Sequence, residues 1–165
     1  MSPPARKEIL ANQGTIWADD EMWFHMNQML KAANKPTWVI MDPLLCAEAI
    51  KRPSSSLIGQ WLRGFAFKPT AILGVVCCNQ HWTPFIWTWT PHCTIASSWD
   101  VPGSPPPGFS VLDQSIATAV GSRTFTAHIV HRNFAAERLC GICALRFIDM
   151  MLRGKMLPTT EAEAF

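Results

Sequence analysis

The chain has 165 residues, of which 48% are hydrophobic and 16% are charged. This composition is typical of a single globular domain and excludes an intrinsically disordered chain. The net charge is only +2, without the strongly basic balance of nucleic-acid-binding proteins, so we expect no nucleic-acid partner.

Membrane insertion and secretion are not expected either. The longest apolar run, Ala71–Cys78, falls far short of the roughly 20 residues that span a bilayer. The N-terminal sequence MSPPARKEIL contains no hydrophobic signal region. We expect no membrane partner and an intracellular protein, cytoplasmic or nuclear, or a domain of a longer one. In that reducing setting most of the six cysteines are expected to be buried apolar residues, with one reactive member.

The first part of the chain favours helices. Residues 1–14 are expected to form a flexible N-terminus. The acids of Asp19–Glu21 precede apolar residues at helical spacing and predict a helix that ends near Asn34, before Pro36. The elements expected next, in chain order, are a strand at 38–41, a turn at Asp42-Pro43, a helix at 44–51, a loop at 52–56 and a helix at 57–64.

The second part opens with a β-rich region. Three stretches, 71–78, 82–90 and 93–99, predict an antiparallel meander. The remaining elements are expected to be an irregular loop at 101–108, a helix at 110–120, a strand at 124–131, a loop at 132–139, a helix at 140–153 and a flexible tail at 158–165. The order indicates an α+β fold with one domain over residues 15–157.

Cys140 is a candidate nucleophile because it opens the last predicted helix. A thiolate there gains from the helix dipole and from the free N–H groups of the first turn, which lower its pKa. Gly141 leaves room for a substrate carbonyl, and N–H groups at this point could hold an oxyanion. The alternative is a buried core cysteine that happens to open a helix.

A nucleophilic cysteine needs a base and a group that orients it, and His81 and Asp100 fit these roles. His81 begins one strand of the meander and Asp100 ends the next, so an antiparallel pairing brings the two positions near each other. A turn histidine and a capping aspartate are the alternatives. The other histidines are His25, His92, His128 and His131.

Four short motifs resemble those of the Ulp-type cysteine peptidases, which deconjugate SUMO and other ubiquitin-like proteins. Ile16–Met22 is similar to their Trp-Leu-x-Asp-x-x-Ile helix start, and His81-Trp82 resembles their His-Trp at the head of a strand. Asp100 falls where their triad acid ends the following strand. Leu139–Cys143 resembles their Asp-Cys-Gly-x-x-x-Cys block. The resemblance covers residues 15–157, and adenovirus-type endopeptidases share the order His, Asp, Cys.

The resemblance implies a papain-like α+β fold of Ulp type, with a central antiparallel or mixed sheet flanked by helices. It implies a triad of His81, Asp100 and Cys140 without cofactor or metal. In the family a Gln about six residues before the Cys helps to form the oxyanion hole, but here Phe134 holds that position. Asn133 is the nearest amide. A substrate groove of Trp17, Asp19, Trp82 and Trp99 is expected, although core packing also explains the tryptophans.

The function implied is hydrolysis of a peptide or isopeptide bond through a thioester, after a Gly-Gly-like C-terminus. The partner would be ubiquitin, a ubiquitin-like protein such as SUMO or NEDD8, or a polyprotein of a virus or mobile element. Two other classes stay open. One is a catalytically weak module that binds a ubiquitin-like protein. The other is a thiol redox protein using Cys140-Gly-Ile-Cys143 as a C-x-x-C motif. A zinc site is not favoured, since no second C-x-x-C exists.

Overall fold

The structure is a computed structural model that describes residues 19–52, 55–78, 81–90, 92–100, 109–122, 124–131 and 140–155. The elements in chain order are α2 (Asp19–Ala33), β1 (Trp38–Ile40), α3 (Pro43–Lys51), α4 (Ser55–Arg63), β2 (Ala71–Cys78), β3 (His81–Trp89), β4 (Cys93–Asp100), α5 (Phe109–Val120), β5 (Thr124–His131) and α6 (Cys140–Arg153). The expected flexible termini and the loops at 101–108 and 132–139 lie outside these residues.

The strands form one mixed sheet in the order β1-β2-β3-β4-β5. The three central strands pair antiparallel, so the predicted meander is confirmed. The two outer strands are parallel to their neighbours. A parallel pair needs a crossover connection, and here helices lie between the paired strands in sequence, α3 and α4 before β2 and α5 before β5. The predicted α+β class, with a mixed sheet flanked by helices, is therefore confirmed.

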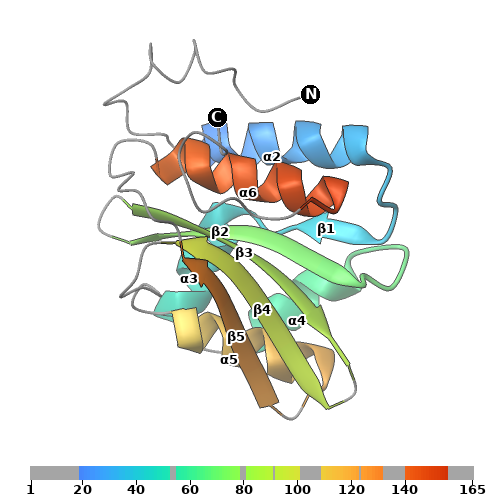
Figure 1. The fold of residues 1–165 in the computed structure, drawn as a ribbon. Helices are drawn as coiled ribbons and strands as arrows, with labels where there is room; N and C mark the ends of the chain where they lie inside the picture. The colour runs from blue at the N-terminus through green and yellow to red at the C-terminus, as the bar shows by residue number, and fades with distance from the viewer. Residues whose placement is uncertain are drawn as a thin grey trace.

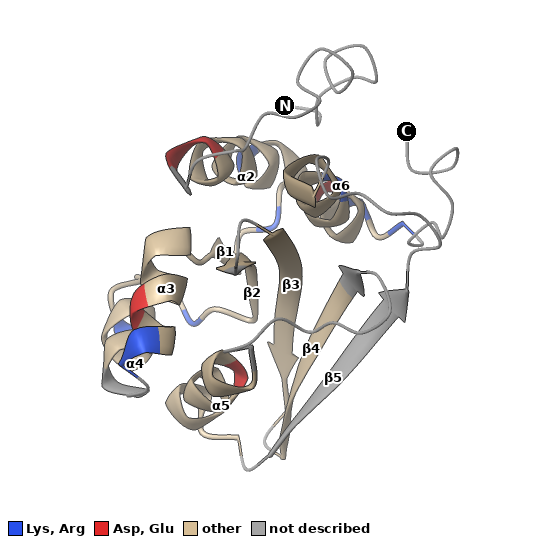
Figure 2. Cartoon of the chain, turned by 90° about the vertical axis from the view of Figure 1, so that its left-hand side faces the viewer, with Lys and Arg blue, Asp and Glu red and all other residues tan. Residues whose placement is uncertain are grey.

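Helices cover both faces of the sheet (Figures 1 and 2). Helices α2 and α6 lie on one face, and α3, α4 and α5 lie on the other. Strand β3 contributes to both cores because its side chains alternate between the faces. Trp82 and Ile86 belong to the α2/α6 core, whereas Phe85 and Trp87 belong to the core on the opposite face. No helix in the described ranges has the length and apolar character needed to cross a bilayer.

The ends of the first helices follow local chemistry. Helix α2 ends at Ala33, and Asn34 follows with a φ of 53°, a left-handed conformation that asparagine tolerates at this position. The side chain of Asp42 accepts a hydrogen bond from the Leu44 N–H and so caps α3. The expected turn is thus a helix cap, and α3 begins at Pro43 because proline fits the first helical position.

Helix α4 begins at Ser55, so the prediction of a loop through residue 56 is wrong by two residues. Three consecutive serines predicted a loop, but serine is also favoured at helix starts. Gly59 does not interrupt the helix, whose neighbouring residue Ile58 is fully buried. Tertiary packing here outweighs the roughly 1 kcal/mol that an interior glycine costs.

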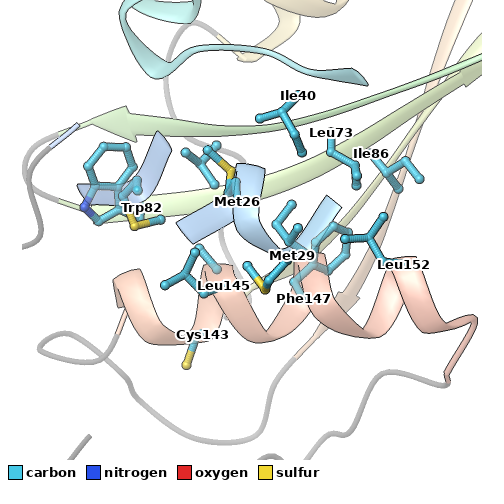
Figure 3. Close-up of a cluster of buried hydrophobic side chains, with 14 of the residues drawn as sticks. Met26, Met29, Ile40, Leu73, Trp82, Ile86, Cys143, Leu145, Phe147 and Leu152 are labelled. Carbon is cyan, nitrogen blue, oxygen red and sulfur yellow. The ribbon is translucent and has the colours of Figure 1, made fainter. Parts of the chain in front are cut away.

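Helix α6 is buried around most of its circumference. It packs on β3 and on α2, so the buried surface is wider than one apolar stripe. Figure 3 shows Leu145, Phe147 and Leu152 of α6 among Met26 and Met29 of α2 and residues of the sheet. Ala144, Leu145, Ile148 and Leu152 are buried, and Met151 is half-buried.

The core under the other face contains a polar contact. The indole Nε1 of Trp87 donates a hydrogen bond to Oδ1 of Asp113, and both residues are fully buried. The second oxygen, Oδ2, is buried without a hydrogen-bond partner. Burial raises the pKa of Asp113 to about 7, and the hydrogen bond from Trp87 opposes this rise only in part. The sequence pattern did not identify this carboxyl as a core residue.

Asp113 should make the stability fall as the pH rises. Its folded pKa of about 7 lies above the ordinary pKa of 3.8 for this group, so between these values the native state binds the extra proton. The wild-type free energy of unfolding should therefore decrease from about pH 4 to about pH 7, relative to Asp113→Asn, by up to roughly 4 kcal/mol. Urea unfolding of both proteins across this range measures the difference, and parallel pH profiles would contradict the assignment.

Gly74 should tolerate no side chain. A Cβ at this position would lie 2.8 Å from Cζ3 of Trp87, a rigid ring packed in the core. Gly74→Ala should lower the free energy of unfolding by about 1–3 kcal/mol through overpacking. The control is Gly59→Ala, whose Cβ would meet only the flexible end of Arg63 at 3.2 Å. If denaturant titration shows equal effects for the two variants, the proposed clash is wrong.

Candidate active site

Cys140 is the first residue of α6, as predicted, and its side chain is buried with 5% exposure. The start of a helix presents unpaired N–H groups and the positive end of the helix dipole. Both favour the thiolate over the thiol. The local fold therefore supplies one of the two conditions for a reactive cysteine, and the second is a proton acceptor within contact.

His81 supplies that acceptor. It is the first residue of β3 and is partly exposed. Its side chain is hydrogen-bonded to the Cys140 sulfur. The close packing of α6 against β3 holds the two residues together. The structure thus places the predicted nucleophile and the predicted base in direct contact.

The surroundings of Cys140 favour its ionised form. Burial acts to raise the pKa of the thiol, but the hydrogen bond and the charge of His81, together with the backbone N–H groups of Trp82 and Gly141, lower the pKa below its usual value. These contacts shift the thiol toward its ionised form, which is the form that acts as a nucleophile.

Trp82 takes part through its backbone. Its N–H group is hydrogen-bonded to Cys140. Sequence reasoning missed this role, because every residue except proline carries an N–H group and no pattern marks one. The indole of Trp82 is 2% exposed and lies in the core beside Met26 (Figure 3). This packing supports the core alternative for Trp82 rather than an open groove.

Asp100, the predicted orienting acid, is described in its backbone only. Asp100 is the last residue of β4 and pairs with His131 of β5. In the pairing of β3 with β4, Phe85 lies opposite Ser98. Because the two strands are antiparallel, the end of β4 runs in the direction of the start of β3, where His81 lies. The orienting role of Asp100 stays a prediction.

The other predicted site residues divide into two groups. Gly141 lies in the site through its N–H group. Trp17 and Asn133 lie outside the described residues, and only the backbones of Asp19 and Trp99 are described, in α2 and β4. The groove and the side-chain part of the oxyanion hole therefore stay predictions.

The competing histidines and cysteines have other surroundings. His25 packs edge-on against Phe24, and the backbone N–H of the exposed His92 donates to Thr90 Oγ1. Cys46 is buried under the opposite face. Cys143 is buried and forms no disulfide with a described residue, and Figure 3 shows its side chain pointing from α6 away from the strands. Within the described ranges, no three His, Cys, Asp or Glu side chains are grouped to hold a metal ion.

Comparison by sequence finds no relative of this chain. No protein-family model matches it, and no curated protein matches it. Any relationship must therefore be read from the arrangement of the backbone.

Comparison by structure finds several cysteine peptidases. The SUMO protease Ulp1 superposes with a TM-score of 0.70 and 13% identity, over 96% of this chain and 76% of Ulp1. The effector XopD of Xanthomonas campestris, in a structure bound to ubiquitin, gives a TM-score of 0.62 and 13% identity, over 98% and 91%. The ASFV pS273R protease gives 0.55 and 14% identity, over 99% and 68%.

The chain therefore has the Ulp-type cysteine peptidase fold, as its motifs predicted. The superpositions extend over nearly the whole of the chain and are not confined to the sheet and one helix. At these identities the likeness defines the fold, and the chemistry rests on the residues that this chain places at its site.

The reactivity of Cys140 should persist at a pH where ordinary thiols are protonated. Its lowered pKa predicts that alkylation by iodoacetamide falls to half its maximum at a pH below the usual value of about 8.5. His81→Ala should raise that midpoint. Mass spectrometry of the labelled peptides measures both, with the exposed Cys77 in the same protein as the control. The same midpoint for Cys140 and Cys77 would contradict the prediction.

Proposed function

We propose that this protein is a cysteine peptidase that hydrolyses a peptide or isopeptide bond. The contact between Cys140 and His81 at the start of α6 carries the proposal, because it lowers the pKa of the thiol in a fold shared with cysteine peptidases. A buried structural cysteine needs neither a histidine partner nor a lowered pKa.

The mechanism follows from these contacts. His81 takes the proton of Cys140, and the thiolate attacks the scissile carbonyl carbon to form a tetrahedral oxyanion. Backbone N–H groups at Cys140 and Gly141 and the amide of Asn133 stabilise that charge. The C–N bond then breaks, the amine leaves with the proton from His81, and a thioester remains. Water, deprotonated by His81, hydrolyses the thioester and restores the thiol.

Asp100 acts as the orienting acid of the triad. A carboxylate beside the imidazole fixes its tautomer and stabilises the imidazolium. The sheet register that leads β4 toward the start of β3 supports this role. Trp82 adds a backbone N–H to the thiolate, which stabilises the ion pair before substrate arrives.

The substrate is a ubiquitin-like protein with a C-terminus of small residues, cleaved after a Gly-Gly-like sequence. Two structural neighbours support this class, since one is a SUMO protease and another is an effector bound to ubiquitin. A polyprotein junction is the second candidate substrate. The likeness to a viral protease, pS273R, favours it.

Electrophilic probes based on ubiquitin, SUMO and NEDD8 test the nucleophile and the substrate together. We expect one probe to form a covalent adduct, measured by intact mass, and Cys140→Ala to abolish it. Cys46→Ala is the control, because that thiol is buried under the opposite face. No adduct with any probe, while iodoacetamide still labels Cys140 rapidly, would favour the polyprotein substrate. If Cys140 reacts no faster than Cys46, the peptidase proposal fails.

Asp100→Asn should lower kcat by about 10³-fold or more while KM changes little, because the imidazole loses its orientation and its counter-charge. The measurement is steady-state hydrolysis of the substrate that the probe panel identifies. Asp42→Asn is the matched control, since Asp42 caps α3 and its replacement still offers an amide oxygen to the Leu44 N–H. A kcat for Asp100→Asn within threefold of wild type would remove Asp100 from the site.

A further inference from the structure

A cavity of about 400 Å³ lies away from Cys140, at the far end of β3. Its lining includes Trp89, the last residue of the strand whose first residue is His81. Eight strand steps separate these two positions, roughly 26 Å. The cavity also includes residues of α4 and α5, the helices on the face opposite to α6 (Figure 1). It is therefore separate from the candidate active site.

The walls of this cavity are aromatic and already packed. The ring centroids of Trp61 and Phe65 lie 5.4 Å apart, and those of Phe65 and Phe67 also lie 5.4 Å apart. These ring contacts hold Phe65 in the cavity wall, which also includes Trp89, while Phe67 remains 40% exposed. A volume of this size matches known ligand sites, which begin at about 300 Å³. The cavity can take one large apolar side chain.

The rim is positively charged. Arg63 and Lys68 line the cavity and are exposed, and the segment from Ser55 to Cys78 contains no Asp or Glu. Neither cation forms a salt bridge with another described residue. The only acid of α5, Asp113, is buried against Trp87. An apolar socket with a cationic rim complements an apolar group that is flanked by negative charge.

The loop beside the cavity adds backbone N–H groups that pair with no described backbone carbonyl. Residues 66–68 follow α4 outside any helix or strand and are exposed. Their N–H groups donate to no other described backbone group. Backbone N–H groups of this kind pair with peptide carbonyls or carboxylates, so the site suits a peptide better than an isolated small molecule.

We propose that this cavity, formed by Phe65, Phe67 and Trp89 and rimmed by Arg63 and Lys68, is a docking site for a partner protein's acidic peptide segment. An aromatic or large aliphatic side chain of the segment fills the socket, and flanking Asp or Glu residues pair with the two cations. Two rim cations are too few to follow a nucleic-acid backbone, which needs an extended basic surface. This proposal does not depend on the proposed peptidase activity.

The test uses a fluorescein-labelled peptide of sequence Glu-Glu-Phe-Glu-Glu and fluorescence polarisation on the full chain. We expect micromolar binding that weakens at least tenfold when Phe is replaced by Ala in the peptide. The double variant Arg63→Glu/Lys68→Glu should also weaken binding at least tenfold. Binding should decrease from 0.05 to 0.5 M salt, because exposed charges contribute.

A matched control changes the same amount of charge elsewhere. Lys31 of α2 and Lys155, which follows α6, are both exposed, and Lys31→Glu/Lys155→Glu should leave the affinity within twofold of wild type. An equal loss of peptide affinity in the two double variants would mean that the binding depends only on net charge, and would overturn the proposal.

Other occupants give different results, and each overturns the proposal. Phenylacetate binding as tightly as the peptide would indicate a small-ligand site. Binding to vesicles of phosphatidylserine that the peptide does not compete for would indicate a membrane surface. A concentration-dependent dimer that Phe67→Ser abolishes would indicate a second copy of this chain. No binding at 1 mM peptide would leave the cavity without a peptide function.

Discussion

The central strand β3 packs against the hydrophobic cores on both faces of the sheet. Its even-numbered residues Trp82 and Ile86 pack under α2 and α6, while Phe85 and Trp87 pack under the helices of the other face. Because these four side chains are committed to opposite cores, the strand has little freedom to slide. A shift by one residue would exchange the two faces. This fixed register holds His81 at the strand start, where the Cys140 sulfur meets it.

Helix α6 is positioned by the same constraint. Its residues Leu145, Ile148 and Leu152 pack in the core shared with Trp82 and Ile86, so the helix can settle in only one orientation over the strand. Cys140 is the first residue of a buried helix, and His81 is the first residue of a strand that is buried on both faces. Apolar packing thus sets the relative positions of Cys140 and His81, and the polar contacts of Cys140 lower the pKa of its thiol.

Sequence patterns identified most of the architecture because the apolar periods are strong. The meander from Ala71 to Trp99 and the helix after Cys140 were found from alternation and helical spacing alone. His81 was predicted as the base of Cys140 because it lies at the start of a strand, a position where a scaffold commonly holds catalytic groups. The parallel pairing of the outer strands was not specified, because a short strand such as β1 carries no signal for the direction of its neighbour.

Other features escaped because they depend on three-dimensional context. Asp113 looks like an ordinary exposed helix residue, and only the position of the Trp87 indole explains its burial. The N–H group of Trp82 carries no sequence signature. The cavity beside Trp89 combines residues from α4, the following loop, β3 and α5, which no local pattern connects. The start of α4 was missed since three serines suit a loop and a helix start equally well.

The close approach of Gly74 to Trp87 also restricts how this sequence can vary. The glycine leaves space for the indole, and the indole in turn donates a hydrogen bond to Asp113. The residue that each of these positions in β2, β3 and α5 can accept therefore depends on the residues at the other two. A smaller ring at position 87 would leave a gap beside position 74. It would also leave the buried carboxyl at position 113 without its hydrogen-bond donor. The effects of substitutions at these positions on stability should be strongly non-additive. Single substitutions should destabilise the fold, whereas matched combinations should be tolerated. In a saturation library of this domain, acceptable residues at these three positions should covary.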